Sequence, residues 1–263
     1  MQLARGEARS HTVSRYQATC NVHWVAMTGD YRRDAGPENW DRYQDLLGPA
    51  IQRVDAGDVE GAAHAFARIA NVRADDEPIT DTLGHLLSLV RYLRNTERVA
   101  AAEISAREAL ALAEAMHPSP HRDLIYAKAR LEQILVRQSK YVDAVDVKRT
   151  IIADLESLYG ARSQNVAAIL LDLAKLHYFA DQRETAEATI RRSIDILEHY
   201  SGVNLELLAQ AHMDLTRMIA LTNVADAVVH AQRALVVLRE AGLSDEDCRV
   251  KLNLRYLEKY MKW

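Results

Sequence analysis

Hydrophobic residues recur along this chain with a helical period, in segments that short polar breaks separate. From Asp123 to Val136 they stand mostly three to five positions apart, which places them on one side of a helix. The polar residues 138–140 interrupt this pattern, and a second helical segment extends from Tyr141 to Tyr159. Gly160 follows it, as glycine often does just past a helix end. The pattern predicts two antiparallel helices joined by a short turn.

This helical hairpin repeats along the chain. A leucine recurs every 42 residues, and a small alanine, an aliphatic residue and a glycine recur with it at nearly the same step. The recurring positions are Leu89, Leu131, Leu173, Leu215 and Leu257; Ala102, Ala144, Ala186 and Ala227; Leu110, Ile152, Ile194 and Leu235; and Gly160, Gly202 and Gly242. Because a small side chain lets two helices approach closely, we expect the alanines at the contact within each hairpin. A larger residue there would cost about 1–3 kcal/mol.

The repeated hairpins resemble tetratricopeptide repeats (TPRs), in the 42-residue form of kinesin light chains and their bacterial relatives. Residues 165–178 are similar to that family's first helix, and residues 184–194 are similar to its second helix. The segment 58–66 looks like the second helix of a further, divergent repeat. The resemblance implies an all-α fold, a right-handed superhelical solenoid of antiparallel helix hairpins whose first helices line the concave surface.

The repeat pattern also predicts how the chain is organised. We expect residues 1–36 to form an N-terminal helix and a linker outside the repeats, and residues 37–263 to form the TPR-like domain. The expected parts of this domain are a divergent first repeat at 38–73, repeats at about 80–118, 122–160, 164–202 and 206–242, and a capping helix at 246–263. The terminal helices can cap the solenoid or form a homodimer, and the sequence leaves both alternatives open.

Composition agrees with an all-helical protein of the cytoplasm. The chain has only 10 Gly and 5 Pro among 263 residues, too few for the turns of an all-β fold. Its net charge of -4 disfavours a general nucleic-acid binder. Apolar runs are too short to span a membrane. Two cysteines, without an apolar leader at the N-terminus, indicate a reducing cytoplasm.

Common catalytic motifs are missing from the sequence. It contains no phosphate-binding loop, no zinc-protease motif and no serine-nucleophile elbow. We therefore expect a non-enzymatic protein without a cofactor or a metal site. Cys20 and His23 would share a helix face, but zinc needs further ligands, so packing of Cys20 in a helix interface is the favoured interpretation. His117 and His121 flank the segment 118–120, which contains two prolines, and indicate a turn between repeats.

The predicted concave surface carries basic and aromatic residues. Counted from the recurring leucines, the predicted groove residues are Arg91, Arg94, Asn95, Gln133, Arg137, Asp172, Lys175, Tyr178, Phe179, Asp214 and Arg217. Arginine forks bind carboxylates and aromatic rings anchor apolar side chains, so this surface predicts a protein or peptide partner with acidic and apolar residues. Asp172 and Asp214 can instead pair with neighbouring cations, and the charges can also form a solvated face that binds nothing.

The leading functional hypothesis is a protein–protein interaction scaffold or adaptor that binds an extended acidic peptide in the groove. One alternative is a regulatory module that senses a peptide or small ligand and acts through a partner protein. Another is an unusual enzyme, with its chemistry at Cys20 and His23 or in the groove.

Overall fold

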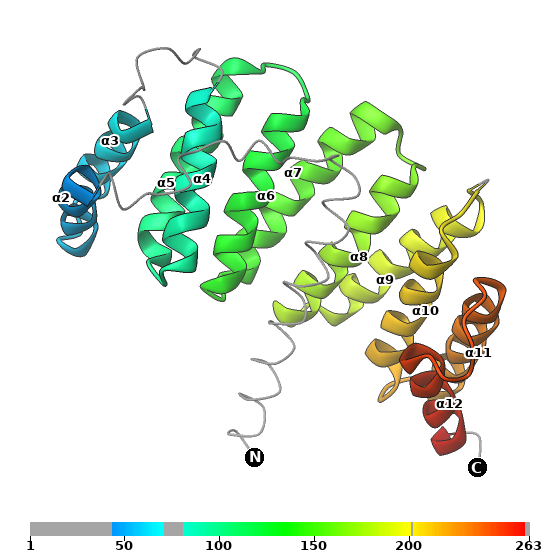
Figure 1. The fold of residues 1–263 in the computed structure, drawn as a ribbon. Helices are drawn as coiled ribbons and strands as arrows, with labels where there is room; N and C mark the ends of the chain where they lie inside the picture. Colours follow the sequence, from blue (N-terminus) through cyan, green and yellow to red (C-terminus); the bar gives the residue numbers. More distant parts are fainter. Residues whose placement is uncertain (1–43, 71–80, 201, 261–263) are drawn as a thin grey trace. The chain divides into compact units, whose positions relative to one another are not determined.

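A computed structural model describes residues 44–70, 81–200 and 202–260 of the chain. These ranges contain eleven α-helices and no β-strand (Figure 1). The prediction of an all-α fold is therefore confirmed. The helices are α2 (Gln44–Asp55), α3 (Val59–Ala70), α4 (Asp81–Asn95), α5 (Val99–Met116), α6 (Arg122–Arg137), α7 (Tyr141–Tyr159), α8 (Gln164–Phe179), α9 (Arg183–Glu198), α10 (Leu205–Ile219), α11 (Val224–Glu240) and α12 (Cys248–Tyr260).

The chain divides into two compact units, and the boundary falls within α7. The N-terminal unit ends at Asp154, and the C-terminal unit begins at Leu155. Sequential helices pack as hairpins in both units, with α4 against α5 in the first and α8 against α9 and α10 against α11 in the second (Figure 1). Neighbouring hairpins contact each other through α5 and α6 in the N-terminal unit, and through α9 and α10 in the C-terminal unit.

A residue with left-handed backbone conformation closes three of the hairpins. Glu97, Ser139 and Asp181 have φ angles of 63°, 60° and 62°. The next residue in each turn donates its backbone N–H to a carbonyl five positions back, which is the bond of a Schellman-type helix end. These bonds run from Arg98 to Leu93, from Lys140 to Leu135 and from Gln182 to His177, at 2.9, 2.9 and 2.8 Å. The turn thus recurs with the period of the sequence.

The recurring residues lie in the core of the hairpins. The five recurring leucines are at most 9% exposed, and the four recurring alanines are fully buried. Because alanine has the smallest side chain that still favours a helix, the paired helices can approach closely at these points. Between α8 and α9 the close approach is reinforced by a buried hydrogen bond, which Ser193 Oγ donates to the carbonyl of Ala167 at 2.7 Å.

Buried charges join α6 to α7 in the N-terminal unit. Lys148 Nζ lies 3.2 Å from Glu132 Oε2, and both side chains are almost completely buried. Lys128 Nζ lies 2.6 Å from Asp154 Oδ2 on the same two helices. Since breaking a buried ion pair costs several kcal/mol, these contacts favour one register of α6 against α7.

The last helix, α12, packs against α11 and buries Val250 and Leu257. Cys248, at its first position, is an exposed free thiol. Within the described ranges, no helix is both long and apolar enough to cross a membrane. The predicted N-terminal helix and linker (1–36) and the last three residues of the predicted capping helix lie outside the described residues.

Candidate functional site

Arginines from α4 and α6 converge in the N-terminal unit. Arg94 donates a hydrogen bond from Nη1 to Oε1 of Gln133 at 3.1 Å, and Arg130 donates one to the same oxygen at 3.2 Å. Arg130 and Gln133 stand three positions apart on α6 and therefore share one side of that helix. The contact of α4 with α6 brings Arg94 to them. Two guanidinium groups thus share one neutral acceptor.

Positive charge accumulates around this shared acceptor. We call Arg91, Arg94, Arg130 and Arg137 the arginine face. Burial lowers the pKa of Arg94, and the charges of Arg130, Arg137 and Arg91 lower it further. Arg137 Nη2 lies 2.5 Å from Glu97 Oε1, whereas no carboxylate in the described ranges forms an ion pair with Arg94 or Arg130. An anion bound here would relieve the repulsion among these like charges.

Tyr126 holds Arg130 in position. The guanidinium carbon of Arg130 lies 4.5 Å from the centroid of the Tyr126 ring, and Arg130 also donates a hydrogen bond to the Tyr126 hydroxyl. The Tyr126 side chain is buried, so the contact fixes the arginine against the helix surface. The Nε atom of Arg130 is buried and has no hydrogen-bond partner among the described residues. Arg130 is therefore part of a prearranged basic site.

The predicted groove residues of the N-terminal unit lie together, but the prediction missed Arg130 and Tyr126. Asn95, at the end of α4, accepts a hydrogen bond from Arg94 at 3.4 Å. The sequence does contain a signal that Arg130 lies on the predicted concave surface. Arg130 immediately precedes the recurring Leu131, just as the predicted groove residues Asp172 and Asp214 precede Leu173 and Leu215. No comparable signal marks Tyr126, whose role depends on where the Arg130 side chain lies.

The predicted groove charges of the C-terminal unit pair with one another. Lys175 Nζ lies 3.6 Å from Asp172 Oδ1 and 3.6 Å from Asp214 Oδ2. Arg217 forms an ion pair with Asp214, and Gln210 donates a hydrogen bond to the same carboxylate at 2.9 Å. Both aspartates are buried, so these contacts neutralise charges inside the fold. The basic charges of Lys175 and Arg217 are therefore balanced by these aspartates, which is the alternative that the sequence left open for Asp172 and Asp214.

Apolar side chains lie at the end of α8 and after α10 in the same unit. Tyr178 is 42% exposed, and its ring forms a T-shaped contact with the Phe179 ring at a centroid distance of 6.1 Å. Leu221, in the turn after α10, is 87% exposed. An exposed tyrosine and leucine can supply contact area to a partner without any charge.

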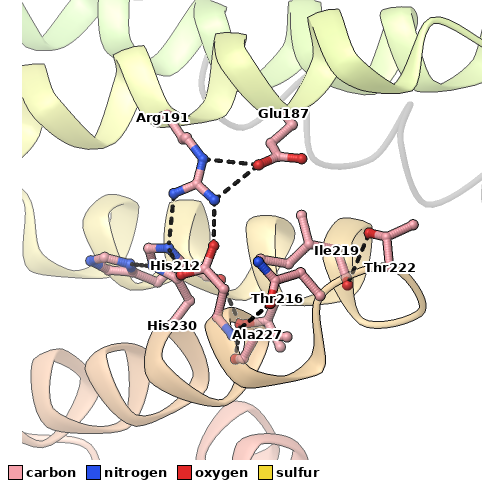
Figure 2. Close-up of polar contacts among 10 residues, drawn as sticks. Glu187, Arg191, His212, Thr216, Ile219, Thr222, Ala227 and His230 are labelled. Carbon is pink, nitrogen blue, oxygen red and sulfur yellow. Dashed lines mark hydrogen bonds and ion pairs between the residues drawn. The ribbon is translucent and has the colours of Figure 1, made fainter.

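A second polar cluster, which the sequence did not predict, joins α9, α10 and α11 in the C-terminal unit (Figure 2). Nδ1 of His212 lies 3.0 Å from Nδ1 of His230, and the two rings stack with their centroids 5.2 Å apart. Arg191 donates hydrogen bonds to Nε2 of His230 at 3.3 Å, to Glu187 at 2.9 Å and to Asp226. The cluster links neighbouring hairpins through side chains.

Both imidazoles of this cluster are neutral at pH 7. Burial lowers the pKa of His212 to about 4, and repulsion from His230, when that ring is protonated, and from Arg233 contributes to the shift. Burial also lowers the pKa of His230, although the charge of Asp226 opposes this effect. Since the two histidines hydrogen-bond each other, the cluster stabilises the packing of the hairpins.

Two further predictions from the sequence concern the pair Cys20 and His23 and the turn that contains His117 and His121. Cys20 and His23 lie outside the described residues. The segment from His117 to His121 is a turn between α5 and α6, as expected. The structure adds that Asp123, in the first turn of α6, lies beside both of these histidines.

Comparison with known proteins identifies the fold. No family model matches the chain, and no curated protein matches its sequence. The structure is similar to BtubC (BKLC) from P. vanneervenii, with a TM-score of 0.57, 17% identity and 92% of each chain covered. It is also similar to a putative kinesin light chain with TPR-like repeats from Podosopora anserina, with a TM-score of 0.56, 14% identity, and 79% of this chain and 100% of that chain covered. The apo form of RapI gives a TM-score of 0.53 at 11% identity, over 83% of this chain and 84% of that chain.

Proposed function

Because this chain is a TPR-like repeat protein by its fold, we propose that it is a non-enzymatic scaffold that binds an acidic segment of a partner protein at the arginine face. The observation that carries this proposal is the shared acceptor. Arg94 and Arg130 both donate to Gln133 Oε1, at 3.1 and 3.2 Å. A carboxylate that displaced this amide would receive two hydrogen bonds between charged groups, which are roughly twice as strong as neutral ones.

The composition of the arginine face indicates what the partner segment contains. Several guanidinium groups lie on two neighbouring helices, so a run of acidic residues fits better than a single carboxylate. In the C-terminal unit, Tyr178, Phe179 and Leu221 would contact apolar residues of the partner. Asp172 and Lys175 would contribute little, since they already pair with each other. The proposed partner therefore has an acidic stretch and separate hydrophobic residues.

The proposal can be tested with a fluorescein-labelled peptide that has a run of glutamate residues followed by separate leucine residues, titrated with the full chain and followed by fluorescence anisotropy. The test variant is Arg94→Gln/Arg130→Gln, which removes both donors but keeps side chains that can form hydrogen bonds. Each lost bond to a charged group is worth about 1.5–3 kcal/mol, so we expect binding to weaken at least about tenfold. Binding to the wild type should also weaken as salt is added.

A matched control removes the same charge from other helices. Arg107 of α5 and Lys140, just before α7, contact Glu103 at 2.8 and 2.7 Å, and neither belongs to the arginine face. The Arg107→Gln/Lys140→Gln variant should bind the peptide as the wild type does. Equal affinity of the two double variants for the peptide would exclude the arginine face as the binding site. The same conclusion would follow if the wild type bound a peptide with glutamine in place of glutamate as tightly as the original peptide.

A further inference from the structure

The turn between α5 and α6 brings three metal-ligating side chains together. His117 caps the C-terminus of α5, His121 caps the N-terminus of α6, and Asp123 lies in the first turn of α6. Two prolines within the segment 118–120 restrict the backbone, so the two histidines are held close to each other. Their rings stack with centroids 3.7 Å apart and an angle of 11° between the planes.

The distances suit a small cation. Asp123 Oδ2 lies 3.2 Å from His117 Nε2 and 3.4 Å from His121 Nδ1. One atom from each of the three side chains lies within 4.8 Å of the others. A tetrahedral ion with bonds of about 2.0–2.1 Å holds its ligand atoms about 3.3–3.4 Å apart. The separation of Asp123 Oδ2 from His117 Nε2 is therefore already close to that of a bound ion.

At His121, the hydrogen bonds of the turn leave a place for a cation beside the carboxylate of Asp123. His121 Nδ1 accepts a hydrogen bond from the backbone N–H of Asp123 at 3.2 Å, so this nitrogen carries no proton. It nevertheless lies 3.4 Å from the carboxylate oxygen of the same residue, which is also an acceptor. His117 Nε2 is buried and has no hydrogen-bond partner in the described part of the chain. A positive ion between His121 Nδ1 and this carboxylate oxygen would replace the repulsion of their lone pairs by attraction.

We propose that His117, His121 and Asp123 bind a divalent transition-metal ion of the zinc type. Two imidazole nitrogens and one carboxylate oxygen are ligands that Zn²⁺ prefers, whereas Ca²⁺ and Mg²⁺ prefer sets of oxygens. Three protein ligands leave the fourth position of a tetrahedral site to water. The ion must lie in the plane of each imidazole, so one of the stacked rings turns when it binds. His121 is the ring that turns, because it is 46% exposed, whereas His117 is 22% exposed.

The turn of His121 gives up its contact at the N-terminus of α6, so the affinity stays below that of a closed structural zinc site. We expect one Zn²⁺ per chain with a dissociation constant in the micromolar range. The measurement is isothermal titration of the full chain, without an affinity tag and after treatment with a chelator, with zinc chloride. Magnesium chloride should give no heat. Cobalt(II) bound at the same place should show the visible absorption of a tetrahedral site.

Two variants locate the ion. His121→Asn removes the imidazole but keeps an oxygen that can cap α6, and His117→Ala removes the buried nitrogen. Each should weaken zinc binding by at least about tenfold. Circular dichroism and thermal unfolding without metal show whether each variant is folded. If His117→Ala is unfolded, His121→Asn decides the question alone.

Two controls separate this site from other ligands in the chain. His199 pairs with a single carboxylate, Asp195 Oδ1 at 3.3 Å, so His199→Ala should bind zinc as the wild type does. Cys20→Ser/His23→Ala should also keep the affinity of the wild type. Absence of zinc binding by the wild type, or unchanged affinity of His121→Asn, would overturn the proposal, as would loss of binding in the Cys20→Ser/His23→Ala variant. The titration contains no peptide, so its result does not depend on the arginine face.

Discussion

The Nδ1 atoms of His212 and His230 lie 3.0 Å apart, so one of them must donate a proton and the other must accept it. The contact of Arg191 with His230 shows which of the two nitrogens is the donor. A guanidinium group can only donate, so its contact at 3.3 Å requires His230 Nε2 to be an acceptor. Neutral His230 therefore carries its proton on Nδ1 and donates it to Nδ1 of His212. His212 then carries its own proton on Nε2, which lies 3.8 Å from Glu198 Oε1.

This arrangement predicts that the protein begins to lose stability as the pH falls below about 6.5, where histidine titrates in the unfolded chain. The pKa of His212 falls from 6.5 to about 4 in the folded state, mainly through burial. Between these values the unfolded chain binds a proton that the folded chain does not, so the free energy of unfolding decreases as the pH is lowered from 6.5 to 4. A shift of this size corresponds to a contribution of about 3 kcal/mol, which urea unfolding at several pH values would measure.

A pair of substitutions assigns this pH dependence to His212. His212→Gln removes the titrating group and keeps an oxygen that can accept from His230, so its stability should vary less with pH between 6.5 and 4. His199→Gln changes an imidazole that is 63% exposed and should retain the pH dependence of the wild type. If all three proteins show the same slope in this range, another group causes the loss of stability.

The recurring alanines predict a steric effect that depends on position within one helix. Ala186 is fully buried where α9 packs against α8, whereas Ala188 on the same helix is exposed. Ala186→Leu should lower the free energy of unfolding by about 1–3 kcal/mol, because the added carbons must push the helices apart. Ala188→Leu should change it by less than about 0.5 kcal/mol. Chemical denaturation of the two variants makes the comparison, and equal effects would show that helix propensity, not packing, selects alanine at position 186.

The glycine after α7 is required by its backbone conformation and not by crowding. Gly160 has a φ angle of 86°, and a Cβ atom added to it would meet nothing within 4 Å. Gly160→Ala should therefore destabilise the protein by about 1–2 kcal/mol, through backbone strain alone. Gly160→Asn should cost less, since asparagine tolerates this conformation better. Thermal unfolding would rank the three proteins, and a more stable alanine variant would contradict this explanation.

Reversing the charge of Lys175 should lower the free energy of unfolding, so a loss of binding in this variant would not by itself show that Lys175 contacts a partner. Lys175 Nζ is 3.6 Å from carboxylate oxygens of both Asp172 and Asp214, and both aspartates are buried. Lys175→Glu would place a third carboxylate beside them, which we expect to cost about 3 kcal/mol or more. Arg162→Glu is a suitable comparison, because Arg162 and its partner Asp195 are both exposed and the change should cost about 1 kcal/mol or less. Denaturant unfolding of both variants tests this; similar stabilities would mean that the Lys175 contacts contribute little.

The helices and their buried residues could be predicted because both follow from short-range patterns. The segment from Tyr141 to Tyr159 was predicted as a helix, and α7 spans the same residues. Leu131 and Ala144 recur at a fixed step because every hairpin meets the same packing requirement, and both are buried. The predicted surface was harder to derive. Arg94 and Gln133 were expected on one surface, and they do meet, but the role of Arg130 between them was not predicted.

The sequence by itself determined that the chain forms helical hairpins, where they turn and which residues they bury, because periodicity and turn residues act within a few positions of each other. Only the tertiary structure decided which charged and titratable groups face each other. Arg94 and Gln133 are 39 positions apart, and His212 and His230 are 18 positions apart on facing helices. A hydrogen bond or ion pair needs a separation of about 3 Å, and that separation is set by how the helices pack.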